Sequence, residues 1–97
     1  VYSVYSPSLL VGTLAKGSTK KTVIATISSG NTGTTYAYKV NPTLRAKYGQ
    51  TSTEYGGTTL VSGTTEITAS VGDVIEIVNL SSDKVVAVAY MTVTEVA

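Results

Sequence analysis

Short runs with an apolar side chain at every second position limit the fold of this chain more than any other feature. In residues 20–28, Val23, Ala25 and Ile27 fall on one face, and residues 85–96 show the same period over a longer stretch. Successive side chains of a β-strand point to opposite faces of a sheet, so this period predicts strands. Residues of turn type, mainly glycine, serine, asparagine and aspartate, separate the runs. The pattern therefore predicts an all-β protein.

The spacing of the runs and turns predicts a single β-sandwich or a small barrel of about seven or eight strands that spans residues 1–97. We expect strands in residues 9–15, 20–28, 34–40, 58–62, 64–71, 73–80 and 85–96, and a short strand or N-terminal arm in residues 1–8. Apolar side chains occupy both faces of residues 20–28, which predicts a central strand. Residues 29–33 (SGNTG) favour a hairpin between residues 20–28 and 34–40.

Residues 41–57 form the longest stretch without strand periodicity, and glycine and proline interrupt it. Within it, residues 43–48 predict at most a helical turn or two. Long connections in compact domains often carry function, and tyrosine and arginine are enriched at protein interfaces. The candidate interface residues are Arg45, Lys47, Tyr48 and Tyr55 of this loop and Tyr2 and Tyr5 near the N-terminus. The alternative is that Tyr48 and Tyr55 are buried and anchor the loop.

Charge is sparse and unevenly distributed along the chain. Charged residues make up 13% of the sequence, and the net charge is +1. All bases but Lys84 precede Glu54, and all the acids lie from Glu54 onward. One interpretation is that antiparallel pairing joins the halves through cross-strand ion pairs. The other is a dipolar particle whose basic and acidic patches meet those of its neighbours. Nucleic-acid binding is not expected, because the acidic half opposes the phosphate field.

The residue types present exclude several classes of chemistry. The chain has no histidine and no cysteine, which rules out Ser-His-Asp and Cys-His nucleophilic sites, zinc and copper sites built on those ligands, and disulfides. No glycine-rich phosphate loop is found. The acids that could bind calcium lack the spacing of a calcium loop; they are Glu54, Asp73, Glu76 and Asp83. We therefore expect no enzyme activity, no cofactor and no metal, and the absence of a long apolar run argues against membrane insertion.

Two tyrosines raise a further binding hypothesis. Tyr36 and Tyr38 share one face of a predicted strand, and with Lys39 they would form a stacking platform for sugars or single-stranded nucleic acid. Together with Tyr48 and Tyr55 they define a carbohydrate- or ligand-binding module as one alternative function. The competing interpretation is that Tyr36 and Tyr38 pack against neighbouring strands within the sheet.

Two stretches resemble known families. Residues 69–79 (ASVGDVIEIVN) resemble the strand that opens with V-G-D in cupredoxin-like and immunoglobulin-like sandwiches, which implies an immunoglobulin-like or related sandwich. The copper ligands of the cupredoxins have no counterpart. Residues 58–68 (TTLVSGTTEIT), with the threonine- and valine-rich texture of the whole chain, resemble small all-β virion proteins of tailed phages, of the capsid-decoration or head-fibre type.

The phage resemblance implies a structural subunit of the virion surface whose partners are copies of itself, a capsid protein, or both. The same texture resembles subunits of extracellular filaments, in which an N-terminal arm adds a strand to a neighbour. Virion surface and extracellular filament both remain open from the sequence.

Overall fold

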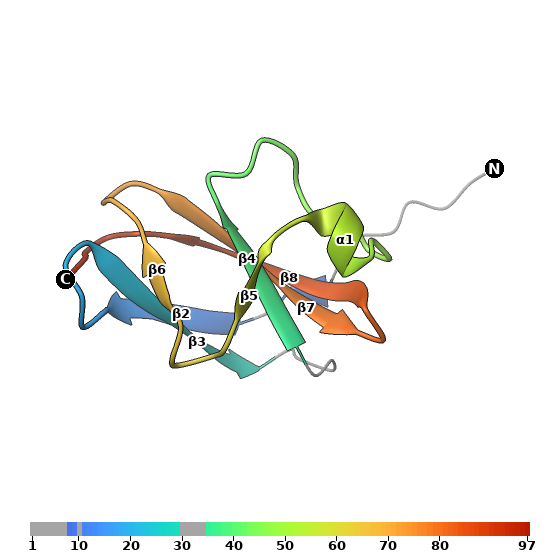
Figure 1. Cartoon of the computed structure of the whole chain (residues 1–97), viewed down its shortest axis with the longest axis horizontal. Helices are drawn as coiled ribbons and strands as arrows, with labels where there is room; N and C mark the ends of the chain where they lie inside the picture. The colour runs from blue at the N-terminus through green and yellow to red at the C-terminus, as the bar shows by residue number, and fades with distance from the viewer. Residues whose placement is uncertain (1–7, 10, 30–34) are drawn as a thin grey trace.

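A computed structural model describes residues 8–9, 11–29 and 35–97 of the chain, and these residues form a β-sandwich (Figure 1). The elements are β1 (Ser8–Leu9), β2 (Val11–Lys16), β3 (Thr22–Ser29), β4 (Thr35–Val40), α1 (Ser52–Tyr55), β5 (Thr58–Leu60), β6 (Glu66–Thr68), β7 (Val74–Ser81) and β8 (Lys84–Thr92). One sheet has five strands in the order β1-β8-β7-β4-β5, and the other has three in the order β2-β3-β6. The all-β prediction is confirmed.

The two sheets bury their facing side chains against each other in a cluster that we call the inner core. From the small sheet, Val23, Ala25 and Ile67 are fully buried, and from the large sheet Ile75 and Ile77 are too. These residues recur at every second position of their strands, as the sequence predicts. β3 is the middle strand of its sheet, which confirms its predicted central position.

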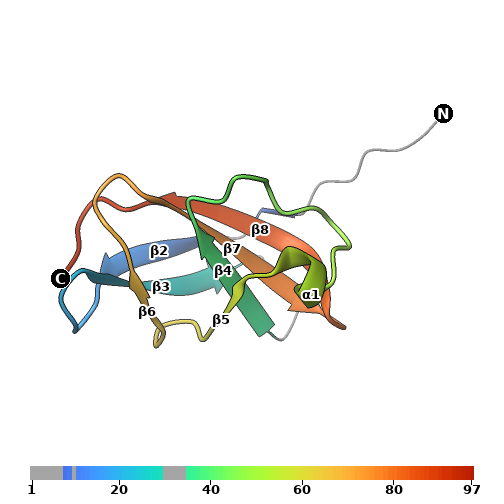
Figure 2. The same ribbon diagram turned by 45° about the horizontal axis from the view of Figure 1, so that its top comes forward.

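The outer face of the large sheet is covered as well, by the chain between β4 and β5. Residues 75–80 of β7 are buried without interruption, which requires cover on both sides of the sheet. The cluster on this outer face, which we call the outer core, consists of Ala37, Ala46, Tyr55, Val78, Leu80, Val85 and Val88, with Tyr90 packed against it. Ala46 and Tyr55 come from the loop of residues 41–57, so this loop forms a third layer (Figure 2).

Two local predictions are wrong because they assign neighbouring segments to one sheet. The single strand predicted for residues 9–15 is two strands: β1 pairs in parallel with β8, and β2 pairs antiparallel with β3 in the other sheet. The hairpin predicted between residues 20–28 and 34–40 does not form, since β4 pairs with β5 and β7. Strands that change sheet are a normal feature at the edges of a sandwich. Residues 30–34, which connect β3 to β4, and the predicted arm through residue 7 lie outside the described residues.

The β7–β8 hairpin combines a tight turn with a bulge. Ser82 and Asp83 both have positive φ, 51° and 65°, as the two central residues of a type I′ turn require. The register passes from Asn79 opposite Ala87 to Leu80 opposite Val85, so β8 has one residue more than β7 at this point. Because of this β-bulge, the side chain of Val85 faces the outer core. Strict alternation along β8 would place Val85 on the same face as Ala87, toward the inner core.

A carboxylate holds the turn between β2 and β3. Oε1 of Glu66, on β6, accepts hydrogen bonds from the backbone N–H groups of Ser18 (2.8 Å) and Thr19 (2.7 Å) and from the hydroxyl of Thr22 (2.9 Å). The hydroxyl of Ser18 donates to Oε2 (2.9 Å). Gly17 is required here, because a Cβ would lie 2.1 Å from Oγ1 of Thr22 and 2.8 Å from Oε1 of Glu66. These donors lower the pKa of Glu66 from 4.5 to about 2, the backbone N–H of Thr19 contributing most.

Glu66 faces a turn that carries three exposed lysines, Lys16, Lys20 and Lys21. Its carboxylate oxygens nevertheless bind backbone amides and hydroxyls of that turn. The three lysines are thus exposed near an acid whose oxygens already accept hydrogen bonds from the turn. Cross-strand ion pairs and a dipolar particle both stay predictions.

We expect Glu66→Gln to reduce the dependence of stability on pH in acid. The native pKa of Glu66 is depressed, so its stabilising effect is complete above about pH 4.5 and is lost as pH falls toward about 2. In the variant, the free energy of unfolding, measured by urea denaturation at several pH values, should fall less steeply across this window.

Some slope will remain in that variant, because hydrogen bonds from the backbone of Ser70 and the side chain of Asn41 also lower the pKa of Asp73. Glu95→Gln removes another exposed carboxylate and serves as the control. Equal acid slopes for Glu66→Gln and the wild type would contradict the role assigned to Glu66.

Candidate functional site

The loop of residues 41–57 is fixed to the large sheet by backbone hydrogen bonds at its start and again in its middle. At its start, the N–H of Asn41 donates to the carbonyl of Val74 (2.7 Å). Farther along, the N–H of Gly49 donates to the carbonyl of Val85 (2.9 Å). The N–H of Val85 in turn donates to the carbonyl of Gln50 (2.8 Å). The loop is thus part of the folded framework and holds its side chains in place.

The short helix α1 ends this loop, and it begins with a capping box. The N–H of Glu54 donates to Oγ1 of Thr51 (3.1 Å), and the N–H of Thr51 donates to Oε1 of Glu54 (3.0 Å). Gly56 ends the helix in the left-handed conformation at φ 70°. Residues 43–48, for which the sequence allows at most a helical turn or two, are not helical. The Thr-x-x-Glu signal at 51–54 marks the true position.

A buried carboxylate lies beneath the loop. Glu76 of β7 has no exposed surface, and in the sheet it stands between Lys39 of β4 and Tyr90 of β8. Its Oε2 accepts the N–H of Ala46 (2.9 Å) and the hydroxyl of Tyr90 (2.7 Å). Oε1 is buried with no hydrogen-bond partner among the described residues. Because the N–H of Ala46 donates to Glu76, this N–H cannot form a helical hydrogen bond.

Two tyrosines flank Glu76, and each has a cation over its ring. Nζ of Lys39 lies 4.5 Å from the ring centroid of Tyr55, and Cζ of Arg45 lies 4.9 Å from that of Tyr90. The hydroxyl of Tyr55 donates to the backbone carbonyl of Glu76 (3.4 Å). Positive and negative groups therefore alternate with aromatic rings across this part of the sheet.

Both phenols stay protonated in the physiological range. Burial, followed by the neighbouring Glu76, raises the pKa of Tyr55. The same causes in the same order raise the pKa of Tyr90 to about 12. Each hydroxyl acts as a hydrogen-bond donor, and neither is poised to serve as a base near neutral pH.

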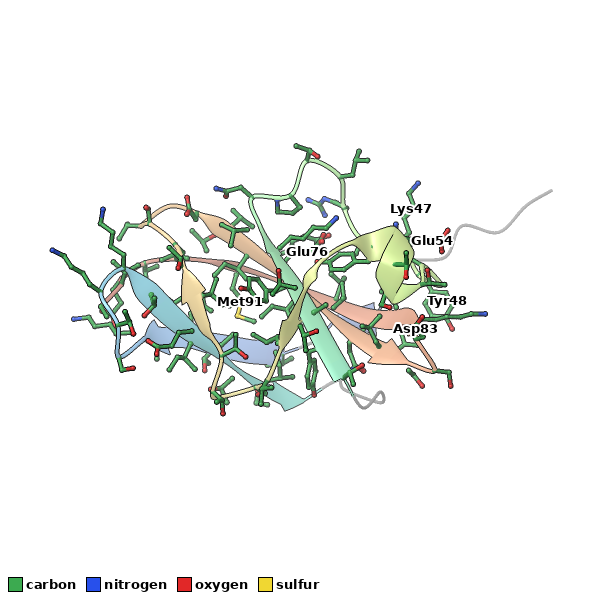
Figure 3. The ribbon with its side chains drawn as sticks, viewed as in Figure 1. Lys47, Tyr48, Glu54, Glu76, Asp83 and Met91 are labelled. Carbon is green, nitrogen blue, oxygen red and sulfur yellow. The ribbon has the colours of Figure 1, made fainter. Side chains whose placement is uncertain are left out.

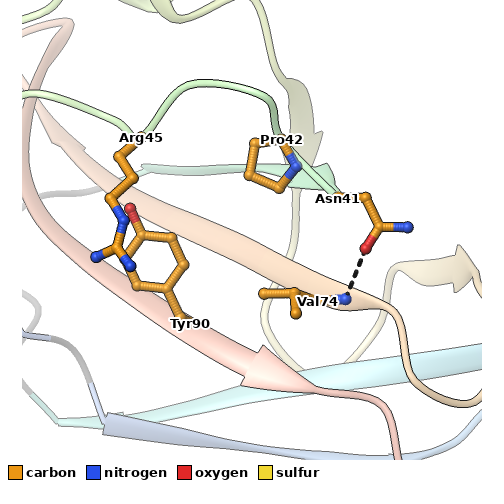
Figure 4. Close-up of a pocket in the computed structure, with 5 residues that line it drawn as sticks. All are labelled: Asn41, Pro42, Arg45, Val74 and Tyr90. Atoms are coloured by element: carbon orange, nitrogen blue, oxygen red, sulfur yellow. Dashed lines mark hydrogen bonds between the residues drawn. The ribbon is translucent and has the colours of Figure 1, made fainter.

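A pocket opens beside Tyr90, where β4 passes into the loop. Its volume is about 310 Å³, and it is lined by Asn41, Pro42, Arg45, Val74 and Tyr90 (Figure 4). Oδ1 of Asn41 accepts the N–H of Val74 (2.9 Å), which fixes one wall. The guanidinium of Arg45 lies over the ring of Tyr90 and forms the opposite wall.

The candidate interface residues separate into exposed and buried ones. Arg45 and Lys47 are exposed, and Tyr48 is 50% exposed. Lys47 and Tyr48 lie at the end of the molecule that also carries Glu54 and Asp83 (Figure 3). These three candidates, with Leu44, make up what we call the loop surface.

Tyr55 is 2% exposed and anchors the loop in the outer core, as the alternative interpretation of this residue predicts. Tyr2 and Tyr5 lie outside the described residues. Tyr36 and Tyr38 pack against the inner core, which bears out the cross-strand packing interpretation for this pair. Their shared face is directed into the sandwich.

Sequence reasoning did not single out Glu76 and Tyr90 as members of this site. A usable signal for Glu76 was present: an acid in the middle of an otherwise apolar strand, with Val74 and Val78 at the same-face positions on either side. A strand buried on both faces must provide such a side chain with a polar partner.

We expect Glu76→Ala to destabilise the protein by about 2–4 kcal/mol, because it leaves the N–H of Ala46 and the hydroxyl of Tyr90 buried without an acceptor. Glu76→Gln is the matched control: its amide oxygen can accept both bonds while its –NH₂ takes the unpartnered place of Oε1, so it should cost about 1–2 kcal/mol and less than Glu76→Ala. Urea denaturation gives both values. Equal losses in the two variants would show that the acceptor at Oε2 is not what holds the loop.

No group of three or more acidic side chains in the described ranges is arranged to hold a metal ion. None of the helices found in those ranges has the length and apolarity to cross a membrane. Comparison of the chain with protein-family models, with curated proteins and with solved structures gave no match.

Proposed function

We propose that this protein is a non-enzymatic structural subunit that binds copies of itself through the loop surface. Its sequence resembles small virion proteins, and we propose that it acts at a virion surface. The observation that carries the proposal is the exposure of Leu44 and Tyr48, 77% and 50%, on a loop that is tied to the sheet. Burying an apolar side chain of this size stabilises by about 1.5–3 kcal/mol. A fixed loop that presents such groups is suited to protein contact.

The charge of the loop surface supports the same function. Lys47 and Tyr48 lie at the same end of the molecule as Glu54 and Asp83 (Figure 3), and Arg45 precedes Lys47 by two positions in the loop. Opposite charges near an exposed aromatic side chain favour one orientation of the partner and speed its approach. Because all four charged side chains are exposed, their contribution should weaken as salt increases.

A filament subunit is the alternative within the same class, and the symmetry of the contact distinguishes the two. An interface that pairs the loop surface with itself closes into a dimer, whereas pairing with a different surface yields a ring or an open filament. The size of the assembly in solution reports which arrangement holds. A virion-surface subunit fits a closed oligomer, and a filament subunit fits open-ended growth.

We expect the wild-type protein to self-associate with rising concentration in sedimentation-velocity experiments, and to do so less at high salt. Replacing Leu44 and Tyr48 together by serine should weaken this association by about tenfold or more, through the loss of buried apolar area.

The matched control is Val61→Ser. Val61 is 56% exposed but lies beyond β5, outside the loop of residues 41–57. It should leave self-association unchanged. A wild-type chain that stays monomeric at the highest soluble concentration, or equal effects of the control and the double variant, would overturn the proposal.

A further inference from the structure

The pocket beside Tyr90 contains a cation without an anionic partner. Among the described residues, no carboxylate and no hydrogen-bond acceptor binds the guanidinium of Arg45, which lies over the ring of Tyr90. Stacking on an aromatic ring uses the flat face of the guanidinium, and its N–H donors lie along the edge. Arg45 is therefore held in orientation by Tyr90 while its donors remain available to a ligand.

The other polar groups around the pocket are already engaged. Asn41 donates from Nδ2 to Asp73 (3.1 Å) and accepts at Oδ1 from the backbone of Val74 (2.9 Å). The second carboxylate oxygen of Asp73 accepts the N–H of Ser70 (2.9 Å). The hydroxyl of Tyr90 donates to Glu76. The charged group that the pocket offers an incoming molecule is thus the planar cation of Arg45, next to the apolar surface of Pro42, Val74 and Tyr90.

From this arrangement we infer that the pocket binds a single carboxylate attached to a small apolar body, with Arg45 donating to both carboxylate oxygens and Pro42, Val74 and Tyr90 contacting the apolar part. Bidentate pairing of guanidinium and carboxylate is among the strongest hydrogen-bonding arrangements in proteins. The volume of about 310 Å³ suits a small organic acid or one amino-acid side chain.

The charges nearby restrict the ligand to a single negative charge. Glu76 accepts a hydrogen bond from Tyr90 and stands opposite Lys39 in the sheet, and Asp73 accepts a hydrogen bond from Asn41. With Lys39 set against Glu76, the charge of Asp73 disfavours a multiply charged anion such as phosphate, whereas a monocarboxylate brings the one charge that Arg45 can balance. The same chemistry comes from a free organic acid or from a glutamate side chain of another protein.

The inference is tested by titrating ¹⁵N-labelled protein with sodium benzoate and, separately, with a glutamate residue capped at both ends, while following backbone amide signals. We expect saturable shifts at Asn41, Arg45, Val74 and Tyr90, with a dissociation constant of about 1–10 mM because the ligands are small. Tighter binding of benzoate assigns the pocket to a free acid, and tighter binding of the capped glutamate assigns it to a protein side chain.

Three variants and one neutral ligand make the result specific. Arg45→Gln should weaken binding by about tenfold or more, and Arg45→Lys should give an intermediate value because it keeps the charge and loses the planar pair of donors. Lys20→Gln removes an exposed cation of the turn between β2 and β3, outside both the pocket lining and the loop surface, and should bind as the wild type does. Benzamide, which has the ring without the charge, should bind much more weakly than benzoate.

No saturable shift with either acid, or equal binding by Arg45→Gln and the wild type, would overturn the inference. Stronger binding of inorganic phosphate than of benzoate would overturn the restriction to one charge. The inference goes beyond the proposed self-association and does not rest on it: a chain that stays monomeric can still bind benzoate, and a chain that assembles can fail to do so.

Discussion

The hydrogen bond from the backbone of Ala46 to the buried carboxylate of Glu76 organises the outer half of this molecule. A buried charge is costly unless polar partners surround it, and Glu76 obtains its partners from two directions. Tyr90 supplies a hydroxyl from the neighbouring strand, and the loop of residues 41–57 supplies a main-chain amide. Keeping the acid satisfied and keeping the loop in place are therefore coupled, and this contact adds to the backbone hydrogen bonds of Asn41, Gly49 and Gln50 that also hold the loop.

Two acids in this chain perform similar structural work in different surroundings. Glu66 lies at the surface and gathers donors from the turn between β2 and β3, whereas Glu76 lies in the interior and gathers them from a loop and a tyrosine. Each joins segments that are distant in sequence. In a chain without cysteine, such carboxylate-to-backbone contacts supply local cross-links between elements that strand pairing alone would leave separate.

Much of the fold follows from local patterns in the sequence, because the strand period is a local property. The central position of β3 is visible in its two apolar faces, and the β7–β8 turn is visible in the Ser82-Asp83 pair. Sheet assignment is different, since it depends on partners far along the chain. Nothing within residues 9–15 indicates that β1 joins β8 while β2 joins β3. The same limit explains the predicted hairpin between β3 and β4, and the candidate site was recognised only through its loop.

The two sides of the loop carry different constraints. Ala46 is 8% exposed and its amide meets the buried acid, whereas Leu44, two positions earlier, is 77% exposed. Substitutions that face inward change whether the third layer forms, and substitutions that face outward change only what the surface displays. Substitutions at the exposed positions can therefore accumulate over evolution and alter the surface of this segment while its fold is kept, because the exposed residues are separate from those that attach the segment to the sheet.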